Sequence, residues 1–586
     1  MNTMSVTHAL AWALFVWFAW AVLQPVKRWR YRNIPGPFGW PLVGNLYGII
    51  TKSIPVLVQE LEAKHGPVFK FWFGGNIWVV LSDPDVARRL SLRFTQRPGF
   101  DYLNVLPHKE LEINKLGLAA TSDMALWRVA RKAYDSSLLI PASLAQYTPT
   151  MDRCVLRLAK RLQQFAASGE TVDMWRELGG MTLEVVGECA YGIDFHSVVD
   201  GRECSEEQQK LGQQLIEACR IVFQQGAIME ASRYVPAQLL FPVLGPLVRR
   251  VAAAFPDARY LKATQSRKLI RDVSESILAD WKRSHALETS NAGADSETTT
   301  GSSSPSSAED HGGAPPIKVS AQLSVSDRSF LNSMMLGRDQ PPPAAKDGFR
   351  GGEERVSAGK AAAARGAGEG REARGPLDDA EVVAQALTFI LAGYETTANT
   401  LAFVIYLLAA NPGAEARLLQ EVDAFGRSKA ITTSDLEKFP YVDAVVKESL
   451  RLHSPAGSIA RLSTEEVQAL GKTIPTGSIL MFPTHSFQNS EQYWPRSTEF
   501  LPQRFLPEGQ EKLGPSTVHA TMPFGAGARM CPGYKFAQQE AKISLVRLYQ
   551  NFTFRLAPGM PRTPKVKTGI TTGPADGVPV VVHSRV

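Results

Sequence analysis

One ten-residue segment near the C-terminal end limits the folds open to this chain more than any other feature. Residues 524–533 read Phe-Gly-Ala-Gly-Ala-Arg-Met-Cys-Pro-Gly, which fits the pattern FxxGxRxCxG. At residue frequencies of about 5%, such a five-position pattern matches by chance on the order of once in several million positions. Cys531 precedes a helix expected to begin near Tyr534, and the N–H groups of that helix together with Arg529 favour a metal-binding thiolate. The alternative is an inert cysteine, because a lone cysteine is most often a small buried hydrophobe.

A long apolar segment carries a second group of polar residues. The segment Leu387–Ala410 is almost continuously apolar, and Asn411-Pro412 ends it. This pattern predicts a helix that begins after Pro376, with Asp378 near its cap. A helix of this length suits a membrane span, but it contains the polar run Gly393–Thr397, which is costly in lipid. We therefore expect a buried helix beside a bound group.

At these segments the chain resembles the cytochrome P450 family, and the resemblance runs from Ile34 to about Val582. It implies a haem (iron protoporphyrin IX) whose iron takes Cys531 as its axial thiolate ligand. A thiolate pushes electron density onto the iron and favours cleavage of the O–O bond. Phe524 and Gly527 belong to the same haem-binding motif, and Gly527 is expected to let the chain pass close under the porphyrin, where a Cβ could clash.

Two further segments match a structural network of the family. The segment Glu448-Ser-Leu-Arg451 matches the ExxR motif, and residues three apart on a helix share a face and can pair. The segment Pro502-Gln-Arg-Phe505 is similar to PERF, whose arginine, here Arg504, completes a Glu-Arg-Arg network under the haem. Gln503 stands where the family usually has glutamate, at a position outside the network.

The run Ala392–Thr397 (AGYETT) matches the oxygen-binding motif (A/G)Gx(D/E)T of the family. The resemblance implies that the small residues Ala392 and Gly393 let the helix pass close to the porphyrin. It also implies that Thr396 holds the water that delivers protons to the reacting oxygen, while Glu395 relays them from solvent. A plain buried Glu–Thr pair inside a core helix is the alternative.

The carboxylates of a haem need cationic partners. The segment Trp127-Arg-Val-Ala-Arg131 matches the WxxxR motif, whose indole N–H and guanidinium face a haem propionate in the family. Arg461 and Arg529 are the other candidates for this role. A surface position is the alternative for each arginine taken alone.

The N-terminal segment predicts a membrane anchor. The stretch Ala9–Leu23 carries no charge and, extended by Gln24-Pro25-Val26, reaches the short end of a membrane span. Four basic residues follow directly, Lys27, Arg28, Arg30 and Arg32, and by the positive-inside rule they stay cytosolic. We expect residues 1–32 to form a single-pass anchor with a basic flank; a cleaved signal and a membrane-surface helix are the alternatives.

Residues 33–586 are expected to form one catalytic domain interrupted by two disordered inserts. The inserts cover about 287–317 and 341–374, where polar and small residues cannot bury enough apolar surface to order the chain. Between them, four apolar residues at helical spacing predict a short docked helix: Phe330, Leu331, Met334 and Met335.

A second apolar stretch, Tyr234–Val248, is broken by three prolines and cannot be a transmembrane helix. The resemblance implies that this stretch corresponds to the F–G region of the family, the segment around helices F and G that dips into the bilayer. The alternative is that this stretch packs inside the domain, because prolines suit a buried corner.

The fold expected is mainly α with a small β part, the triangular-prism architecture of the family, preceded by the anchor. Most periodic segments predict helices, while Val68–Phe73 and Ile77–Leu81 predict a hairpin. A net charge of +7 spread over 586 residues does not favour nucleic-acid binding. The five cysteines include no CxxC pair, which argues against a disulfide framework or a zinc site.

The activity implied is insertion of one atom of O₂ into a lipophilic organic substrate. The chain carries no flavin or NAD(P) fingerprint, so electrons must come from a separate protein. The resemblance implies NADPH–cytochrome P450 reductase at the endoplasmic reticulum membrane, with cytochrome b5 as a second candidate donor. The alternatives are a haem-thiolate isomerase or peroxygenase that uses a peroxide substrate, and a non-catalytic haem-binding protein.

Overall fold

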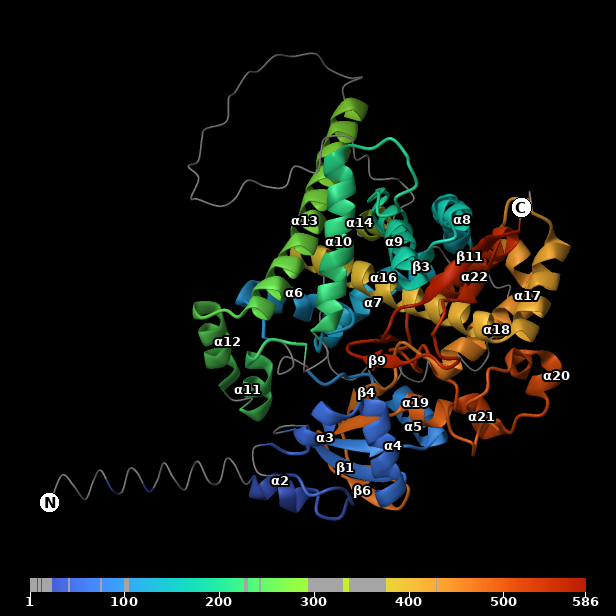
Figure 1. The fold of residues 1–586 in the computed structure, drawn as a ribbon. Coiled ribbons are helices and arrows are strands. Elements are labelled where there is room, and N and C mark those ends of the chain that lie inside the picture. Colours follow the sequence, from blue (N-terminus) through green and yellow to red (C-terminus); the bar gives the residue numbers. More distant parts are fainter. Residues whose placement is uncertain are drawn as a thin grey trace, which may run out of the picture.

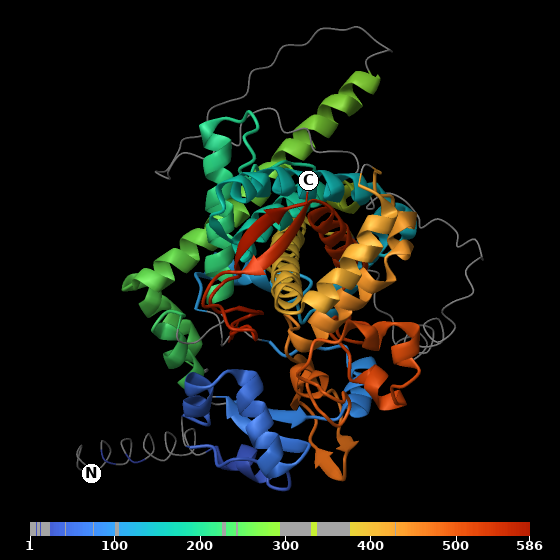
Figure 2. The ribbon, with the colours of Figure 1, turned by 45° about the vertical axis from the view of Figure 1, so that its right-hand side comes forward.

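The computed structural model describes residues 8, 12, 24–40, 43–73, 76–99, 105–225, 230–241, 244–293, 330–336, 376–427 and 429–585. A large helical body lies above a smaller end that carries the β1–β2 hairpin and strands β4 to β7 (Figure 1). Turned by 45°, the molecule shows the N-terminal part in blue and a much later part in orange side by side in this smaller end (Figure 2). The prediction of a mainly α fold with a small β part is confirmed.

Helices dominate both halves of the described chain. The helices before the inserts are α2 (Pro25–Arg30), α3 (Leu46–Thr51), α4 (Ile54–His65), α5 (Pro84–Arg93), α6 (His108–Leu116), α7 (Met124–Leu138), α8 (Pro141–Ser168), α9 (Met174–Val186), the π-helical turn η2 (Gly187–Tyr191), α10 (Glu206–Gln224), α11 (Tyr234–Leu240), α12 (Gly245–Ala254) and α13 (Ala258–Gly293). The later helices are α14 (Phe330–Leu336), α16 (Asp379–Ala410), α17 (Pro412–Phe425), η4 (Thr433–Lys438), α18 (Pro440–Leu452), α19 (Thr484–Gln488), η5 (Pro502–Phe505), α20 (Pro507–Gln510), α21 (Pro515–His519) and α22 (Tyr534–Asn551).

Within the described residues, the strands form one mixed sheet and three smaller antiparallel ones. The strands are β1 (Val68–Phe73), β2 (Asn76–Leu81), β3 (Thr171–Asp173), β4 (Ile459–Leu462), β5 (Val467–Ala469), β6 (Lys472–Ile474), β7 (Ile479–Phe482), β8 (Phe552–Leu556), β9 (Val566–Thr568), β10 (Thr572–Pro574) and β11 (Pro579–Ser584). The mixed sheet has the order β1-β2-β7-β4, and the others are β3-β11-β8, β5-β6 and β10-β9. The predicted hairpin is confirmed, with Val68 opposite Leu81 and Phe73 opposite Asn76.

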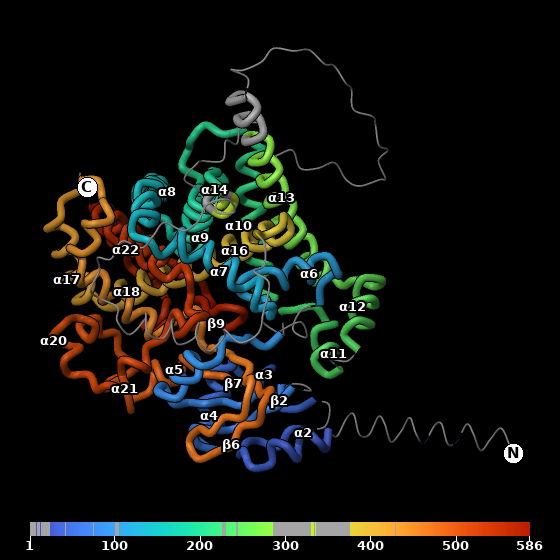
Figure 3. Tube along the Cα trace, turned by 180° about the vertical axis from the view of Figure 1, so that it is seen from behind, coloured from blue at the N-terminus to red at the C-terminus, as the bar shows by residue number. Residues whose placement is uncertain are grey.

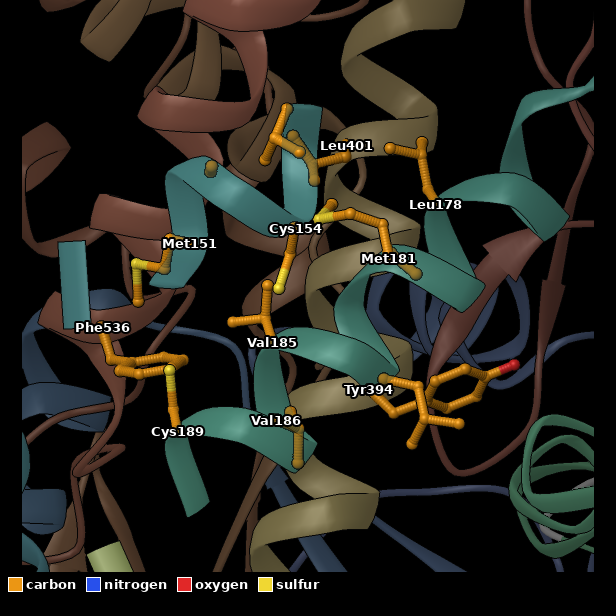
Figure 4. Close-up of a cluster of buried hydrophobic side chains, with 14 of the residues drawn as sticks. Met151, Cys154, Leu178, Met181, Val185, Val186, Cys189, Tyr394, Leu401 and Phe536 are labelled. Carbon is orange, nitrogen blue, oxygen red and sulfur yellow. The ribbon is translucent and has the colours of Figure 1, made fainter. Parts of the chain in front are cut away.

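The core is built around α16, which is buried along most of its length. As predicted, the helix begins after Asp378, whose side chain accepts the Glu381 N–H in a capping box. Met181 and Val185 of α9 lie beside Cys154 of α8, and Cys189 lies beside Phe536 of α22 (Figure 4). Tyr394 of α16 also packs on α9, where a Cβ on Gly179 would lie 3.2 Å from its hydroxyl oxygen. The long apolar helix is therefore a core element.

No helix in the part of the chain that the structure describes is both long and apolar enough to span a membrane. The apolar stretch of the predicted anchor, residues 9–23, lies outside the described residues except for residue 12. Its basic flank packs on the small end of the molecule: Arg28 lies 4.6 Å from the Trp72 ring centre, and the buried Tyr31 hydroxyl is 2.8 Å from Ser478 Oγ.

The predicted docked helix is present as α14. The Phe330 ring lies 4.7 Å from that of Tyr134 on α7 and 4.8 Å from that of Phe389 on α16. The buried Trp281 of α13 donates its indole N–H to Asn332 Oδ1 at 2.9 Å. The structure places residues 287–293 of the first predicted insert in α13, whereas the rest of that insert and all of residues 341–374 lie outside the described residues.

The predicted F–G stretch forms α11 and α12, which lie beside α3 at the edge of the molecule (Figure 3). Leu239 is fully buried and shares a core with Leu46 of α3, so α11 packs inside the domain. By contrast, Leu247 of α12 is 55% exposed, and Phe255, which directly follows α12, is 69% exposed. The packing alternative is therefore confirmed for α11, whereas the membrane contact of α12 stays a prediction.

Candidate active site

A cavity of about 560 Å³ lies between α16, α7, strand β4 and the loop that precedes α22. Its volume is typical of a small-molecule site. Most of the residues predicted for the site line it, namely Trp127, Arg131, Thr396, Arg461, Phe524, Arg529 and Cys531. The other two predicted residues, Glu395 and Gly527, do not line the cavity.

The cysteine loop is folded by its own backbone hydrogen bonds. The Cys531 N–H donates to the Phe524 carbonyl oxygen at 2.9 Å, and the Met530 N–H donates to that of Gly527, also at 2.9 Å. Gly525 and Gly527 have φ values of 76° and 74°, a left-handed conformation that residues with a Cβ rarely adopt. The loop thus places the Cys531 side chain in the cavity wall, directly before α22 begins at Tyr534.

The protein alone does not favour a Cys531 thiolate, which corrects the expectation from sequence. Burial raises the pKa of this thiol above its usual value, while the Gly533 N–H, Arg131 and Arg97 act in the opposite direction. Arg529, which the sequence suggested, is not among the groups that lower this pKa. Coordination to a metal ion deprotonates a thiol outright, so a metal ion bound at Cys531 would itself supply the thiolate state.

Two glycines predicted to face the porphyrin make room for protein. A Cβ on Gly527 would lie 2.4 Å from the Ser91 carbonyl oxygen on α5. A Cβ on Gly393 would lie 2.6 Å from Val186 Cγ2 on α9, although Gly393 also borders the cavity. The reason predicted for Gly527 is therefore corrected, because this glycine lets α5 approach closely. Gly393 lets α9 approach closely and also borders the cavity, so its approach to the porphyrin stays a prediction.

Buried arginines without carboxylate partners line one side of the cavity. Arg461 donates to the carbonyl oxygens of Ala460 (2.9 Å) and Ala526 (3.2 Å). Arg529 donates to those of Thr95 (2.8 Å), Leu118 (3.1 Å) and Thr121 (3.2 Å). Among the described residues, neither guanidinium forms an ion pair with a carboxylate. Burial first, and then repulsion from Arg97, lower the pKa of each to about 9.

Burying cations without counter-charges is unfavourable, so this wall suits a ligand with carboxylates. The Nε atom of Arg461 is buried and has no hydrogen-bond partner in the described structure. The donor set on the cavity wall, a thiol and several guanidinium groups, fits a haem, which carries an iron and two propionates.

Trp127 and Arg131 both reach the cavity from α7 as the WxxxR motif predicts. The Arg529 guanidinium stacks on the Trp127 ring at 4.5 Å. Arg131 Nε donates to Asp135 Oδ1 at 2.8 Å, and its Nη1 donates to the Met530 carbonyl oxygen beside Cys531. Arg131 therefore ties α7 to the cysteine loop.

The predicted Glu-Arg-Arg arrangement is present between α18 and η5. Glu448 and Arg451 are fully buried and form two hydrogen bonds of 2.8 Å. Arg504 Nε lies 3.3 Å from Glu448 Oε1, and the Leu501 N–H donates to that same carboxylate at 3.0 Å. The three side chains hold α18 to the segment around η5, and none of them lines the cavity.

Thr396 and Glu395 are adjacent in sequence but face different surroundings. Thr396 lines the cavity, and its hydroxyl donates to the Ala392 carbonyl oxygen at 2.6 Å, which leaves its lone pairs available. The Glu395 carboxylate is turned toward the β9–β10 hairpin and accepts a hydrogen bond of 2.5 Å from the Thr571 hydroxyl. Burial raises the pKa of Glu395 to about 7, against smaller lowering contributions from Thr571, Asn399 and Lys567.

Two residues of the site were given no role from the sequence. Arg97 lines the cavity and donates to the Ala119 carbonyl oxygen at 2.7 Å, and burial lowers its pKa. Thr571 contacts Glu395, as described above. Both belong to irregular segments without a motif, and only the folded chain brings them to the site.

Comparison with known proteins identifies the family. The family model described as Cytochrome P450 matches residues 34–278 and 362–578. Cytochrome P450 3A6 of Oryctolagus cuniculus is 43% identical over 536 residues, which cover 89% of this chain and 86% of that protein. Cytochrome P450 3A9 of Rattus norvegicus is 41% identical, covering 89% and 86%. Thromboxane-A synthase of Macaca fascicularis is 26% identical and covers 100% of this chain and 98% of its own length.

The match to the family model covers most of the chain and includes the cysteine loop, α16, α18 and β4. The family implies a haem-thiolate cofactor and monooxygenase chemistry, and the cavity wall described above fits that cofactor. The chain belongs to the cytochrome P450 family.

Proposed function

We propose that Cys531 supplies the axial thiolate of the haem, and that this monooxygenase oxidises its substrate in the cavity beside Cys531. The observation that supports this most directly is the position of Cys531 in the wall of the cavity of about 560 Å³, with Thr396 on the same cavity. The other four cysteines, Cys154, Cys189, Cys204 and Cys219, do not line it. When bound, the haem supplies the oxygen activation that no side chain of this protein can perform.

Four arginines are the proposed partners of the haem propionates: Arg97, Arg131, Arg461 and Arg529. All four line the cavity, and the pKa values of Arg97, Arg461 and Arg529 are lowered by burial. Carboxylates placed among them would relieve this unfavourable burial, because charge-assisted hydrogen bonds to guanidinium are strong. Trp127 holds the Arg529 guanidinium in place by stacking. Phe524 lines the same wall, while Gly527 supports the loop from outside the cavity.

Thr396 and Glu395 are the proposed proton-handling residues. Thr396 can hold a water in the cavity through its free lone pairs. Glu395, whose pKa is raised to about 7, can accept and release a proton near neutral pH. We expect Thr396→Ala to consume NADPH and release peroxide while forming less product. Thr388→Ala is a matched control, because Thr388 also lines the cavity and donates to its own helix. Coupling equal to wild type in Thr396→Ala would contradict the role of Thr396.

The electron donor proposed is NADPH–cytochrome P450 reductase, with cytochrome b5 as a second donor, and the substrate is a lipophilic small molecule. The apolar cavity residues Phe389, Leu450, Pro455 and Ile570 support such a substrate. Turnover of lipophilic probe compounds with NADPH, reductase and isotopically labelled O₂ tests this. One labelled oxygen atom in the product supports a monooxygenase, whereas turnover of a peroxide substrate without NADPH would indicate isomerase or peroxygenase chemistry.

Residues 1–32 are proposed to anchor the catalytic domain on the cytosolic side of the endoplasmic reticulum membrane, with α12 as a second contact. The second contact is supported by the exposure of Leu247 on α12 and of Phe255 directly after it. Trp29, Phe38 and Trp40 are exposed near the N-terminal end of the described domain and support the first contact.

Flotation on liposomes distinguishes membrane binding by the N-terminal anchor from membrane binding by α12. The truncation should end before Pro25, because Tyr31 is buried against the domain. The truncated protein should retain partial binding, which Leu247→Ser with Phe255→Ser should abolish. Leu239→Ser is not a suitable probe, since Leu239 is fully buried. Unchanged binding of the double serine variant would contradict the second contact.

A further inference from the structure

The turn between β9 and β10 reaches the site from outside every recognised motif. Its three residues are Gly569, Ile570 and Thr571, and the Gly569 N–H donates to the Thr571 carbonyl oxygen at 2.9 Å. The Ile570 side chain lines the cavity and is 53% exposed. Thr571, the next residue, does not line the cavity and instead donates its hydroxyl to Glu395 Oε1 at 2.5 Å. One turn therefore touches both the cavity and the acid.

The amide of Asn399, one helical turn after Glu395, supports this contact. Trp175 of α9 donates its indole N–H to Asn399 Oδ1 at 2.6 Å, which fixes the orientation of the amide. The Nδ2 atom then points at the hairpin, 3.0 Å from the Thr572 carbonyl oxygen and 3.5 Å from Thr571 Oγ1. Three elements, α9, α16 and the hairpin, thus meet around the hydroxyl that binds Glu395.

The hairpin has little freedom to leave this position. The Thr572 N–H donates to the Pro455 carbonyl oxygen at 2.9 Å. A Cβ on Gly573 would lie 3.1 Å from the Asn399 amide, so the glycine allows the strand to lie directly against that side chain. The Thr571 hydroxyl is therefore held at Glu395 by contacts on both sides of the turn.

We propose that Thr571 is a positioning residue that, supported by Asn399, holds the Glu395 carboxyl turned away from the cavity. The inference rests on the proposed role of Glu395 in proton handling. In this arrangement the acid is kept beside the hairpin, and its carboxyl must leave Thr571 before it can face Thr396 in the cavity.

The charge state of Glu395 reports directly on this contact. A hydroxyl that donates to a carboxylate stabilises its charged form, so Thr571 lowers the pKa of Glu395 against the effect of burial. The other titratable groups that act on this carboxyl or respond to it are Lys567 of β9, Cys219 of α10 and the neighbouring Tyr394. None of them is altered by a substitution at Thr571.

Infrared spectroscopy of the haem-loaded protein across a pH series tests the proposal. The Glu395 carboxyl band is assigned as the one absent from Glu395→Gln. We expect Thr571→Val to raise the pKa of this band by about one unit, since a hydrogen bond to a charged group is lost. Thr571→Ser should keep the wild-type pKa, because it retains the hydroxyl.

A matched control lies in the same hairpin. The buried Thr568 hydroxyl has no hydrogen-bond partner in the described structure, so Thr568→Val should leave the Glu395 band unchanged. If Thr571→Val reduces haem content, Thr571→Ala provides a second variant for the same comparison. A Glu395 band with the same pKa and frequency in Thr571→Val and wild type would overturn the proposal, as would an equal shift in Thr568→Val.

The result of the infrared test does not depend on whether Glu395 takes part in catalysis. If Glu395→Gln leaves product formation and coupling unchanged, the proton role of Glu395 fails, yet the infrared comparison still decides whether Thr571 positions the carboxyl. A shift in Thr571→Val that is absent in Thr571→Ser supports the inference in either case.

Discussion

Buried charged side chains differ in how their charge is compensated. Glu448 and Arg451 compensate each other at 2.8 Å and need no ligand. Arg461 and Arg529 form no ion pair with a carboxylate among the described residues, and burial is the main cause of their lowered pKa values. A pair of the first kind stabilises the fold, whereas arginines of the second kind prepare a site for an anion.

The raised pKa of Glu395 predicts that the stability of the protein depends on pH. Its pKa is about 7 in the folded chain against an ordinary value of 4.5, so the folded state binds the proton more tightly than the unfolded state. Stability from this group is complete below pH about 4.5 and is lost as the pH rises through about 7.

The variant Glu395→Gln stays neutral and should escape this loss. Its stability relative to wild type should rise by up to about 3 kcal/mol between pH 5 and pH 8, because one pKa unit corresponds to about 1.4 kcal/mol. Urea unfolding of both proteins at the two pH values measures the difference. Parallel pH dependence in the two proteins would show that Glu395 is not buried as the structure describes.

Among the elements, the cysteine loop depends on its close packing against α5. Gly527→Ala would combine a φ of 74° with a Cβ placed 2.4 Å from the Ser91 carbonyl oxygen. The left-handed conformation alone costs about 1–2 kcal/mol, and relief of the clash must separate the loop from α5. We expect a lower melting temperature and reduced haem content.

Gly471→Ala is the matched control for this prediction. Gly471 has a φ of 73°, but a Cβ there would meet no atom within 4 Å. Its effect should be limited to the conformational strain, and haem content should be unchanged. Equal losses in the two variants would mean that the contact with α5 is unimportant.

The sequence identified residues whose chemistry depends on local spacing. Cys531 with its flanking glycines, Glu448 three residues before Arg451, and the Asp378 cap are all set within one loop or one helical turn, so a motif can reveal them. The docked helix α14 followed from the apolar spacing of residues 330–335. Arg97 and Thr571 were given no role because only tertiary packing brings their loops to the cavity.

The same limit explains the corrected interpretations. The sequence shows that Gly393 and Gly527 are small, but it cannot show that α9 and α5 occupy the space of the missing Cβ atoms. The pKa of the Cys531 thiol was misjudged because burial, its largest determinant, is a property of the folded chain.

At the scale of the whole molecule, α14 should contribute to stability while the segments around it should not. Deleting residues 295–317, or separately 341–374, should change the unfolding free energy by only about 1 kcal/mol, since loop entropy varies slowly with length. Phe330→Ala should cost about 3–5 kcal/mol, because Phe330 is buried between Tyr134 and Phe389. Thermal unfolding and haem content measure both effects. A deletion as destabilising as Phe330→Ala would mean that the removed segment packs on the domain.

The proposed function depends on Cys531 binding the haem iron as a thiolate in this cavity. The carbon-monoxide difference spectrum of the reduced protein tests it most directly, with Cys531→Ala compared with wild type and with Cys204→Ser, which alters a cysteine outside the cavity. We predict the thiolate-type spectrum in wild type and Cys204→Ser and its loss in Cys531→Ala. Persistence of the thiolate-type spectrum in Cys531→Ala, or its absence from the haem-loaded wild type, would contradict the assignment.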